Sequence, residues 1–79
     1  MERNEIYAKL AGIFKDVFDD ASIEITDATT ADDIEDWDSL SHMTLMAEVE
    51  EAFNVKFLMK DVLGMKNVGE MVDVLEREV

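Results

Sequence analysis

The sequence contains no cysteine and no proline, and it has only three glycines among 79 residues. The absence of cysteine excludes disulfides and thiolate metal sites, and it leaves the chain without a thiol nucleophile of its own. The absence of proline, together with so little glycine, favours helices with few forced breaks. No apolar run approaches the roughly 18 to 20 residues that cross a bilayer, so we expect no membrane span.

Positive charge is also scarce. The chain has 7 Lys and Arg residues against 20 Asp and Glu residues, which gives a formal net charge of −13. A nucleic-acid-binding protein needs a basic face to displace counterions, so the charge argues against a nucleic-acid partner. A hydrophobic content of 48% is nevertheless too high for a disordered acidic tail. The length predicts a single domain over residues 1–79, and the N-terminus lacks a secretory signal pattern, so we expect a cytoplasmic protein.

The negative charge is concentrated in one half of the chain. Between Asp16 and Val55 there are 13 acidic residues and no Lys or Arg, whereas the remaining acidic and basic residues cancel. A run of charge is usually a solvated face. Because self-repulsion opposes compaction, however, a stretch that tolerates it can serve as a docking surface for basic partners.

The acidic loop does not have the spacing of a calcium-binding loop. If such a loop began at Asp32, its glycine position would hold Trp37 and its final glutamate position would hold Met43. We therefore expect weak, diffuse binding of divalent cations by the acidic residues and no dedicated metal site.

Apolar residues recur at helical spacing in three long segments, which predicts helices over residues 4–18, 38–53 and 67–77. A shorter helix is predicted over residues 59–63, ended by Gly64. Asp38 is suited to cap the second helix, and Asn67 with Glu70 has capping-box spacing at the last one. Between the first two helices lies a loop of about twenty residues, which Ile23, Ile25 and Ile34 are expected to hold to the core. The core itself is expected from the inner faces of the helices: Ile6, Leu10, Phe14, Leu45, Val49, Phe53, Val68, Val72 and Leu75.

The second helix is predicted to have two apolar faces. At 100° per residue, one arc contains His42, Leu45, Met46, Val49, Ala52 and Phe53 and is assigned to the core. A second arc contains Leu40, Met43 and Ala47, and it is bordered by Glu50 and Glu51. The core does not need this second strip, which begins beside Ser39.

Ser39 and His42 lie three residues apart and could suggest a nucleophile with its base. A hydrolase also needs a positioned third group, an oxyanion site and a pocket. We therefore expect His42 to be packed and hydrogen-bonded, and Trp37 to be a partly buried anchor. Met46, Met59, Met65 and Met71 are expected to fill the core, whereas Met43 is the exception because it lies on the outer arc.

The segment Trp37-Asp38-Ser39-Leu40 follows a long acidic loop and opens an amphipathic helix. With this arrangement the whole chain strongly resembles the acyl carrier protein family. The resemblance implies that Ser39 carries a 4′-phosphopantetheine arm through a phosphodiester, which would supply the thiol that the chain lacks. It further implies that Asp38 supports attachment by helping to hold a transient magnesium ion, and that Leu40 and Met43 meet the phosphopantetheinyl transferase (the holo-carrier synthase). A phosphate on Ser39 would also be favoured by the helix N-terminus.

At some positions the residue type differs from the one that carriers of fatty acid synthesis usually have. Ser41, His42 and Thr44 stand where those carriers often place acids, and Lys60 lies in a short helix that is usually acidic. The cargo could therefore belong to fatty acid, specialised lipid or polyketide biosynthesis, or be an aminoacyl group.

The sequence as a whole predicts an all-α fold: a small four-helix bundle of three main helices and one short helix, with a long first loop. The expected function is that of a non-catalytic, monomeric acyl carrier that holds its cargo as a thioester. Its docking residues are expected to be Leu40, Met43, Ala47, Glu50 and Glu51, and its partners the transferase and acyl-loading or acyl-transfer enzymes with basic patches. The alternative from another class is an unmodified acidic adaptor.

Overall fold

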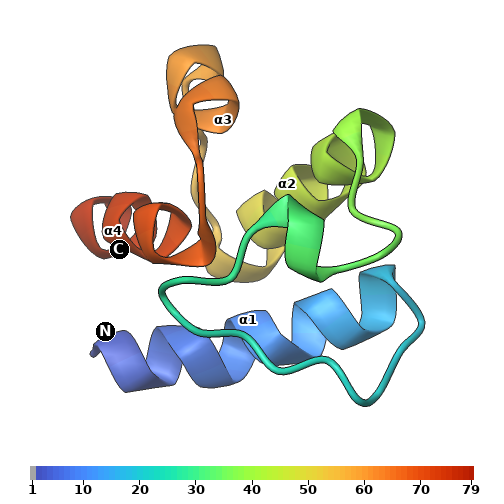
Figure 1. The fold of residues 1–79 in the computed structure, drawn as a ribbon. Helices are drawn as coiled ribbons and strands as arrows, with labels where there is room; N and C mark the ends of the chain where they lie inside the picture. Colours follow the sequence, from blue (N-terminus) through green and yellow to red (C-terminus); the bar gives the residue numbers. More distant parts are fainter. Residues whose placement is uncertain (1) are drawn as a thin grey trace.

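The computed structural model describes residues 2–79, and all regular structure in this part of the chain is helical (Figure 1). This confirms the predicted all-α fold of three main helices and one short helix, with a long loop between the first two helices. A short 3-10 turn, η1, within that loop was not predicted. In the described residues, no helix combines the length and hydropathy needed to cross a membrane. The elements in chain order are α1 (Arg3–Val17), η1 (Ala31–Asp33), α2 (Ser39–Phe53), α3 (Met59–Gly64) and α4 (Val68–Glu78).

The core lies between α1, α2 and α4. Helix α1 runs along one side of the molecule and makes its main helix–helix contacts with α2 and α4 (Figure 1). The nine inner-face side chains predicted for the core, from Ile6 to Leu75, are buried, and burying each large aliphatic or aromatic one is worth about 1.5–3 kcal/mol relative to exposure. Within residues 2–79, the largest fully buried side chains are those of Ile6, Leu10, Phe14, Leu45, Val49, Val68, Met71, Val72 and Leu75.

The long first loop is held to the core by its isoleucines, as predicted. Ile23 and Ile34 are buried, and Ile25 packs against the core cluster. The loop also caps α4, because the carbonyl of Asp27 accepts the amide of Gly69 at 3.0 Å. A Cβ atom on Gly69 would lie 2.9 Å from that carbonyl oxygen, so the close approach requires glycine.

An arginine at the start of α1 joins three parts of the chain. The guanidinium of Arg3 pairs with Asp27 in the loop at 2.9 Å and with Asp73 and Glu76 in α4. The hydroxyl of Tyr7 also donates to Asp27. Partial burial and this hydrogen bond raise the pKa of Tyr7 to about 12. The cluster therefore fixes the N-terminus of α1 and the loop against α4.

Two details differ from the sequence-based expectations. Asn67 does cap α4 by accepting the amide of Glu70, but the Glu70 carboxylate accepts from the amide of Lys66 and does not close the box on Asn67. Met59 is 59% exposed, so its assignment to the core was wrong. Helix α3 has six residues, and only Val62 among them is buried, which leaves Met59 without a core to fill.

Candidate functional site

Asp38 caps the N-terminus of α2, as predicted. The Asp38 carboxylate accepts the amide of Ser41 at 2.9 Å, and the Asp38 amide donates to the Ser41 hydroxyl at 2.8 Å. The amide of Ser41 holds the pKa of the Asp38 carboxyl below its usual value, since it donates to the ionised form. The helix therefore starts at a defined residue, Ser39, under a capping anion.

The two serines of this turn differ in what their hydroxyls do. Ser41 is half-buried, and its hydroxyl donates to the carbonyl of Asp36 at 2.7 Å while accepting from Asp38. Ser39 is exposed, and its hydroxyl has no hydrogen-bond partner within residues 2–79. The free hydroxyl at the start of α2 is therefore that of Ser39.

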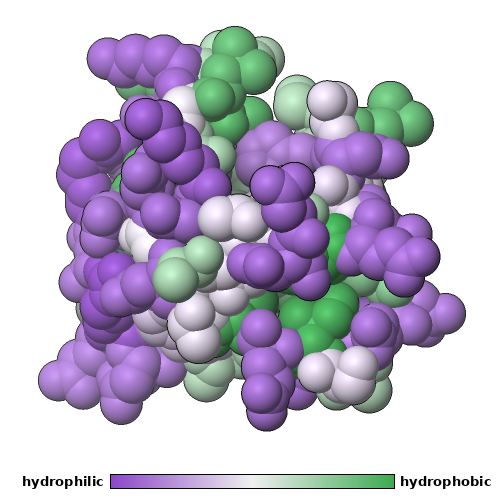
Figure 2. All heavy atoms as spheres, in the orientation of Figure 1, coloured by the Kyte–Doolittle hydropathy of each residue, from purple (hydrophilic) through white to green (hydrophobic). Residues whose placement is uncertain are grey.

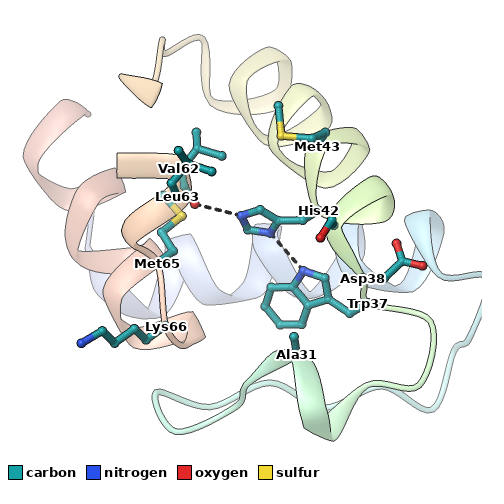
Figure 3. A pocket seen from close by; sticks show the side chains of 10 residues that line it. Ala31, Trp37, Asp38, His42, Met43, Val62, Leu63, Met65 and Lys66 are labelled. Carbon is teal, nitrogen blue, oxygen red and sulfur yellow. Dashed lines mark hydrogen bonds between the residues drawn. The ribbon is translucent and has the colours of Figure 1, made fainter. Parts of the chain in front are cut away.

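Trp37 and His42 form a hydrogen-bonded pair behind this serine. The indole N–H of Trp37 donates to Nδ1 of His42 at 3.0 Å, and Nε2 of His42 lies 3.1 Å from the carbonyl oxygen of Val62. With Nδ1 as the acceptor, Nε2 carries the proton and donates to Val62 (Figure 3). Both ring nitrogens are occupied, so His42 is not placed to act as a base for Ser39. The expectation of a packed, hydrogen-bonded histidine is confirmed.

Trp37, which was expected to be only partly buried, is buried. Trp37 is 8% exposed, and its ring meets Phe14 edge-on, with the ring centroids 5.2 Å apart. The His42 ring stacks on it, with a centroid distance of 5.8 Å. The segment before Ser39 is thus fixed to the core by one large side chain.

A pocket of about 480 Å³ opens between the start of α2 and α3 (Figure 3). The Trp37–His42 pair forms its inner wall, and Met43 and Leu63 stand on opposite sides of it. Its lining is mostly apolar, and it includes Ser39. The lining residues are Ala31, Trp37, Asp38, Ser39, His42, Met43, Val62, Leu63, Met65 and Lys66.

The two predicted faces of α2 are distinct in the structure. Leu45, Met46, Val49 and Phe53 are buried, whereas Leu40 is 81% exposed, Met43 is 46% exposed and Ala47 is exposed. The assignment of these apolar residues to an inner and an outer face is therefore confirmed.

The two acids at the edge of the outer face have different surroundings. Glu51 is exposed, but Glu50 is half-buried and its carboxylate accepts the amide of Phe57 at 2.8 Å. Glu50 thus also holds the connector that leads to α3, a role that the sequence analysis missed. No three acidic or histidine side chains within residues 2–79 are placed to hold a metal ion together.

Comparison with known proteins identifies the fold and its family. A family model described as a phosphopantetheine attachment site matches residues 8–75, which is most of the chain. The chain belongs to the acyl carrier protein family. The solution structure of holo acyl carrier protein from Geobacter metallireducens is similar, with a TM-score of 0.86 and 42% identity over 91% of this chain and 83% of that one.

Two curated acyl carrier proteins are also similar in sequence. The acyl carrier protein of Rhodococcus erythropolis is 32% identical over 76 residues, which cover 95% of this chain and 82% of that protein. The meromycolate extension acyl carrier protein of Mycolicibacterium aurum is 31% identical over 75 residues, covering 95% of this chain and 77% of that protein. The chain is accordingly a non-catalytic acyl carrier whose prosthetic group is 4′-phosphopantetheine. As in the rest of the family, its partners are a phosphopantetheinyl transferase and biosynthetic enzymes.

The start of α2 fits this prosthetic group. The first amides of a helix have no intrahelical acceptor, so an anion attached there finds free donors and the positive end of the helix dipole. The Asp38 carboxylate already takes the Ser41 amide, so an anion attached at this end of α2 would meet the other first-turn amides that have no intrahelical acceptor. The apolar pocket beside Ser39 offers room for part of the arm or its cargo.

Proposed function

We propose that the hydroxyl of Ser39 is the attachment point of the 4′-phosphopantetheine arm. The observation that carries the proposal is the exposed, unpartnered Ser39 hydroxyl at the first position of α2, beside a Ser41 hydroxyl that is already engaged. In the attachment reaction an Oγ–P bond forms and the P–O bond of the coenzyme A pyrophosphate breaks, which releases adenosine 3′,5′-bisphosphate. The hydroxyl proton passes to a base of the transferase or to water. The group supplies a thiol for thioester formation, which the cysteine-free chain does not have.

Asp38 supports attachment in this proposal. Its carboxylate is exposed and points away from the Trp37–His42 pair (Figure 3). It adjoins Ser39 in the chain and stays ionised to a low pH because Ser41 stabilises the charged form. A magnesium ion held transiently by Asp38 and the transferase would offset the negative charge that gathers as the phosphate approaches.

The outer face of α2 is proposed to dock partner enzymes. Leu40, Met43 and Ala47 form its apolar centre, and Glu51 contributes a free negative charge. In such a surface the apolar centre supplies most of the affinity, and the charges mainly set the encounter rate. Glu50 adds charge to this edge, but its bond to Phe57 makes it unsuitable for a substitution that must leave the fold intact.

The proposal also covers the domain that carries Ser39, the pocket for the acyl chain and the further partner enzymes. We propose that residues 1–79 act as one carrier domain, because the four helices share one core. We also propose that this carrier is monomeric and cytoplasmic. We propose further that the pocket beside Ser39 shelters the first part of the acyl chain, and that the inner faces of the helices part to shelter the rest. Acyl-loading and acyl-transfer enzymes with basic patches are the expected further partners, in fatty acid or specialised lipid or polyketide biosynthesis.

The attachment site is tested by incubating the apo protein with coenzyme A and a broad-specificity phosphopantetheinyl transferase. Intact mass should show one added arm in the wild type and in Ser41→Ala, and none in Ser39→Ala. Circular dichroism should show equal helicity in both variants. An adduct that persists in Ser39→Ala would reject the site, and failure of every preparation to accept an arm would favour the unmodified adaptor.

A further inference from the structure

We infer that the transferase that modifies Ser39 docks on a carrier surface that is negative along α2 and positive along α3. The transferase would present a basic rim to α2 and carboxylates to α3. This inference rests on the proposed attachment at Ser39. It adds to the outer face of α2 a second, oppositely charged contact, formed by Leu63 and Lys60 of α3 and by Lys66 in the segment that follows α3.

The transferase is the partner whose footprint is most tightly constrained. An enzyme that acts on the cargo can reach it at the far end of the arm, but the transferase must bring its reacting phosphorus to Oγ of Ser39 itself. Ser39 and Met43 line the same pocket as Leu63 and Lys66, so its mouth is bordered by both helices (Figure 3). An enzyme that closes on Ser39 therefore covers part of α3 as well as α2.

Apolar side chains are exposed on both sides of this pocket. Leu63 of α3 is 75% exposed, and Met59 lies one turn before it on the same side of the helix. On α2, Leu40 and Met43 are exposed. Figure 2 shows hydrophobic atoms over α3 and over the beginning of α2. Single exposed apolar residues are ordinary, but a group of them around one pocket marks an interaction site.

The charges around these apolar residues change sign between the helices. From Asp38 to Phe53 there are four acids and no Lys or Arg. From Lys56 to Lys66 there are three lysines and one acid, Asp61, whose carboxylate is paired with Arg77 at 2.9 Å. Within residues 2–79, neither Lys60 nor Lys66 has an ion-pair partner, and both are exposed. A complementary partner therefore presents cations to α2 and carboxylates to α3.

The test is the rate at which the transferase of the native host modifies the apo protein, measured as kcat/KM against salt concentration. Lys60→Glu and Lys66→Glu should each lower kcat/KM about twofold to fivefold at low salt, and the loss should shrink at high salt as the charges are screened. The matched control is Lys15→Glu, an exposed lysine on α1 whose reversal changes the net charge by the same amount. It should have a smaller effect than Lys60→Glu or Lys66→Glu.

A second variant tests the apolar part of the contact. Leu63→Ala should raise KM at every salt concentration, and circular dichroism should be unchanged because the side chain is exposed. Wild-type rates in Lys60→Glu, faster rates, or an equal loss in Lys15→Glu would overturn the inference. A dimer in size-exclusion chromatography that Lys60→Glu dissolves would also overturn it, since a second copy would then occupy the surface. If the proposed attachment fails, the wild type itself gains no arm on Ser39, which separates the two failures.

Discussion

Helix α2 lies between two neighbours that are packed very differently. Toward α1 its side chains meet Ile6, Leu10 and Phe14, all fully buried. Toward α3 it faces an open pocket and a six-residue helix in which Val62 is the buried residue. Short isolated helices are marginal in water, so α3 depends on its few contacts with the rest of the chain. The comparison teaches that one face of α2 builds the core while the other, with α3, remains available for binding.

The largest expected effect is a difference in stability between two leucine-to-alanine variants, one on the inner face of α2 and one on α3. Leu45→Ala should lower the free energy of unfolding by about 2–5 kcal/mol, because it leaves a cavity in a fully buried site. Leu63→Ala should change it by less than about 0.5 kcal/mol, since that side chain is mostly in water. Urea unfolding followed by circular dichroism measures both. Equal losses of unfolding free energy in the two variants would mean that Leu63 on α3 is packed as firmly as the face of α2 that meets α1.

The next effect concerns the contact between the first loop and α4. Gly69→Ala should cost about 1–3 kcal/mol, because the new methyl group would press on the backbone of Asp27. The matched control is Gly12→Ala in α1, where a Cβ atom meets nothing within 4 Å. That substitution should be neutral or stabilising, since alanine is the better helix former. Thermal unfolding of both proteins provides the comparison, and a stable Gly69→Ala would show that the loop is free to shift.

A smaller effect is expected where α2 is joined to α3. His42→Phe removes the acceptor of the Trp37 indole and the donor to the Val62 carbonyl, and should cost about 1–2 kcal/mol. It should also shift the fluorescence of Trp37, the single tryptophan. Hydrogen exchange in α3 should rise more than in α1. Unchanged exchange in α3 would show that the His42 bridge does not hold that helix.

The smallest effect is the pH dependence of the α2 cap. The pKa of Asp38 is lower in the folded protein than its ordinary value of 3.8, so its contribution to stability is present above that value. The contribution is lost as the pH falls through the lowered pKa. Asp38→Asn keeps a capping side chain without the charge. The difference in melting temperature between wild type and Asp38→Asn should therefore be larger at pH 7 than at pH 3, and a constant difference would contradict the assigned cap.

Much of the fold could be predicted from the sequence because local signals agreed with one another. The helical spacing of Ile6, Leu10 and Phe14 and the capping residues Asp38 and Asn67 gave the helices to within a residue or two at most ends. The separation of Leu45 from Leu40 on opposite arcs of α2 is likewise a local property. These features depend on residues close together in the chain.

The rest depends on contacts between distant residues. The bond from His42 to Val62 and the approach of Gly69 to Asp27 join separate elements, and no local pattern specifies them. The Arg3 cluster combines the two ends of the chain with the loop. Met59 was misplaced because an apolar residue in a short helix carries no periodicity long enough to show which side is buried. The start of α2 was therefore better predicted than the contacts that surround it.

The central claim is that Ser39 carries the arm in the cell. It is tested most directly by mass spectrometry of the carrier isolated from its native host, with intact mass followed by fragmentation of the peptide around Trp37–Met43. The account predicts a phosphopantetheine adduct on Ser39, with or without an acyl group that identifies the cargo. An unmodified Ser39 in every preparation, or an adduct located on Ser41, would contradict it.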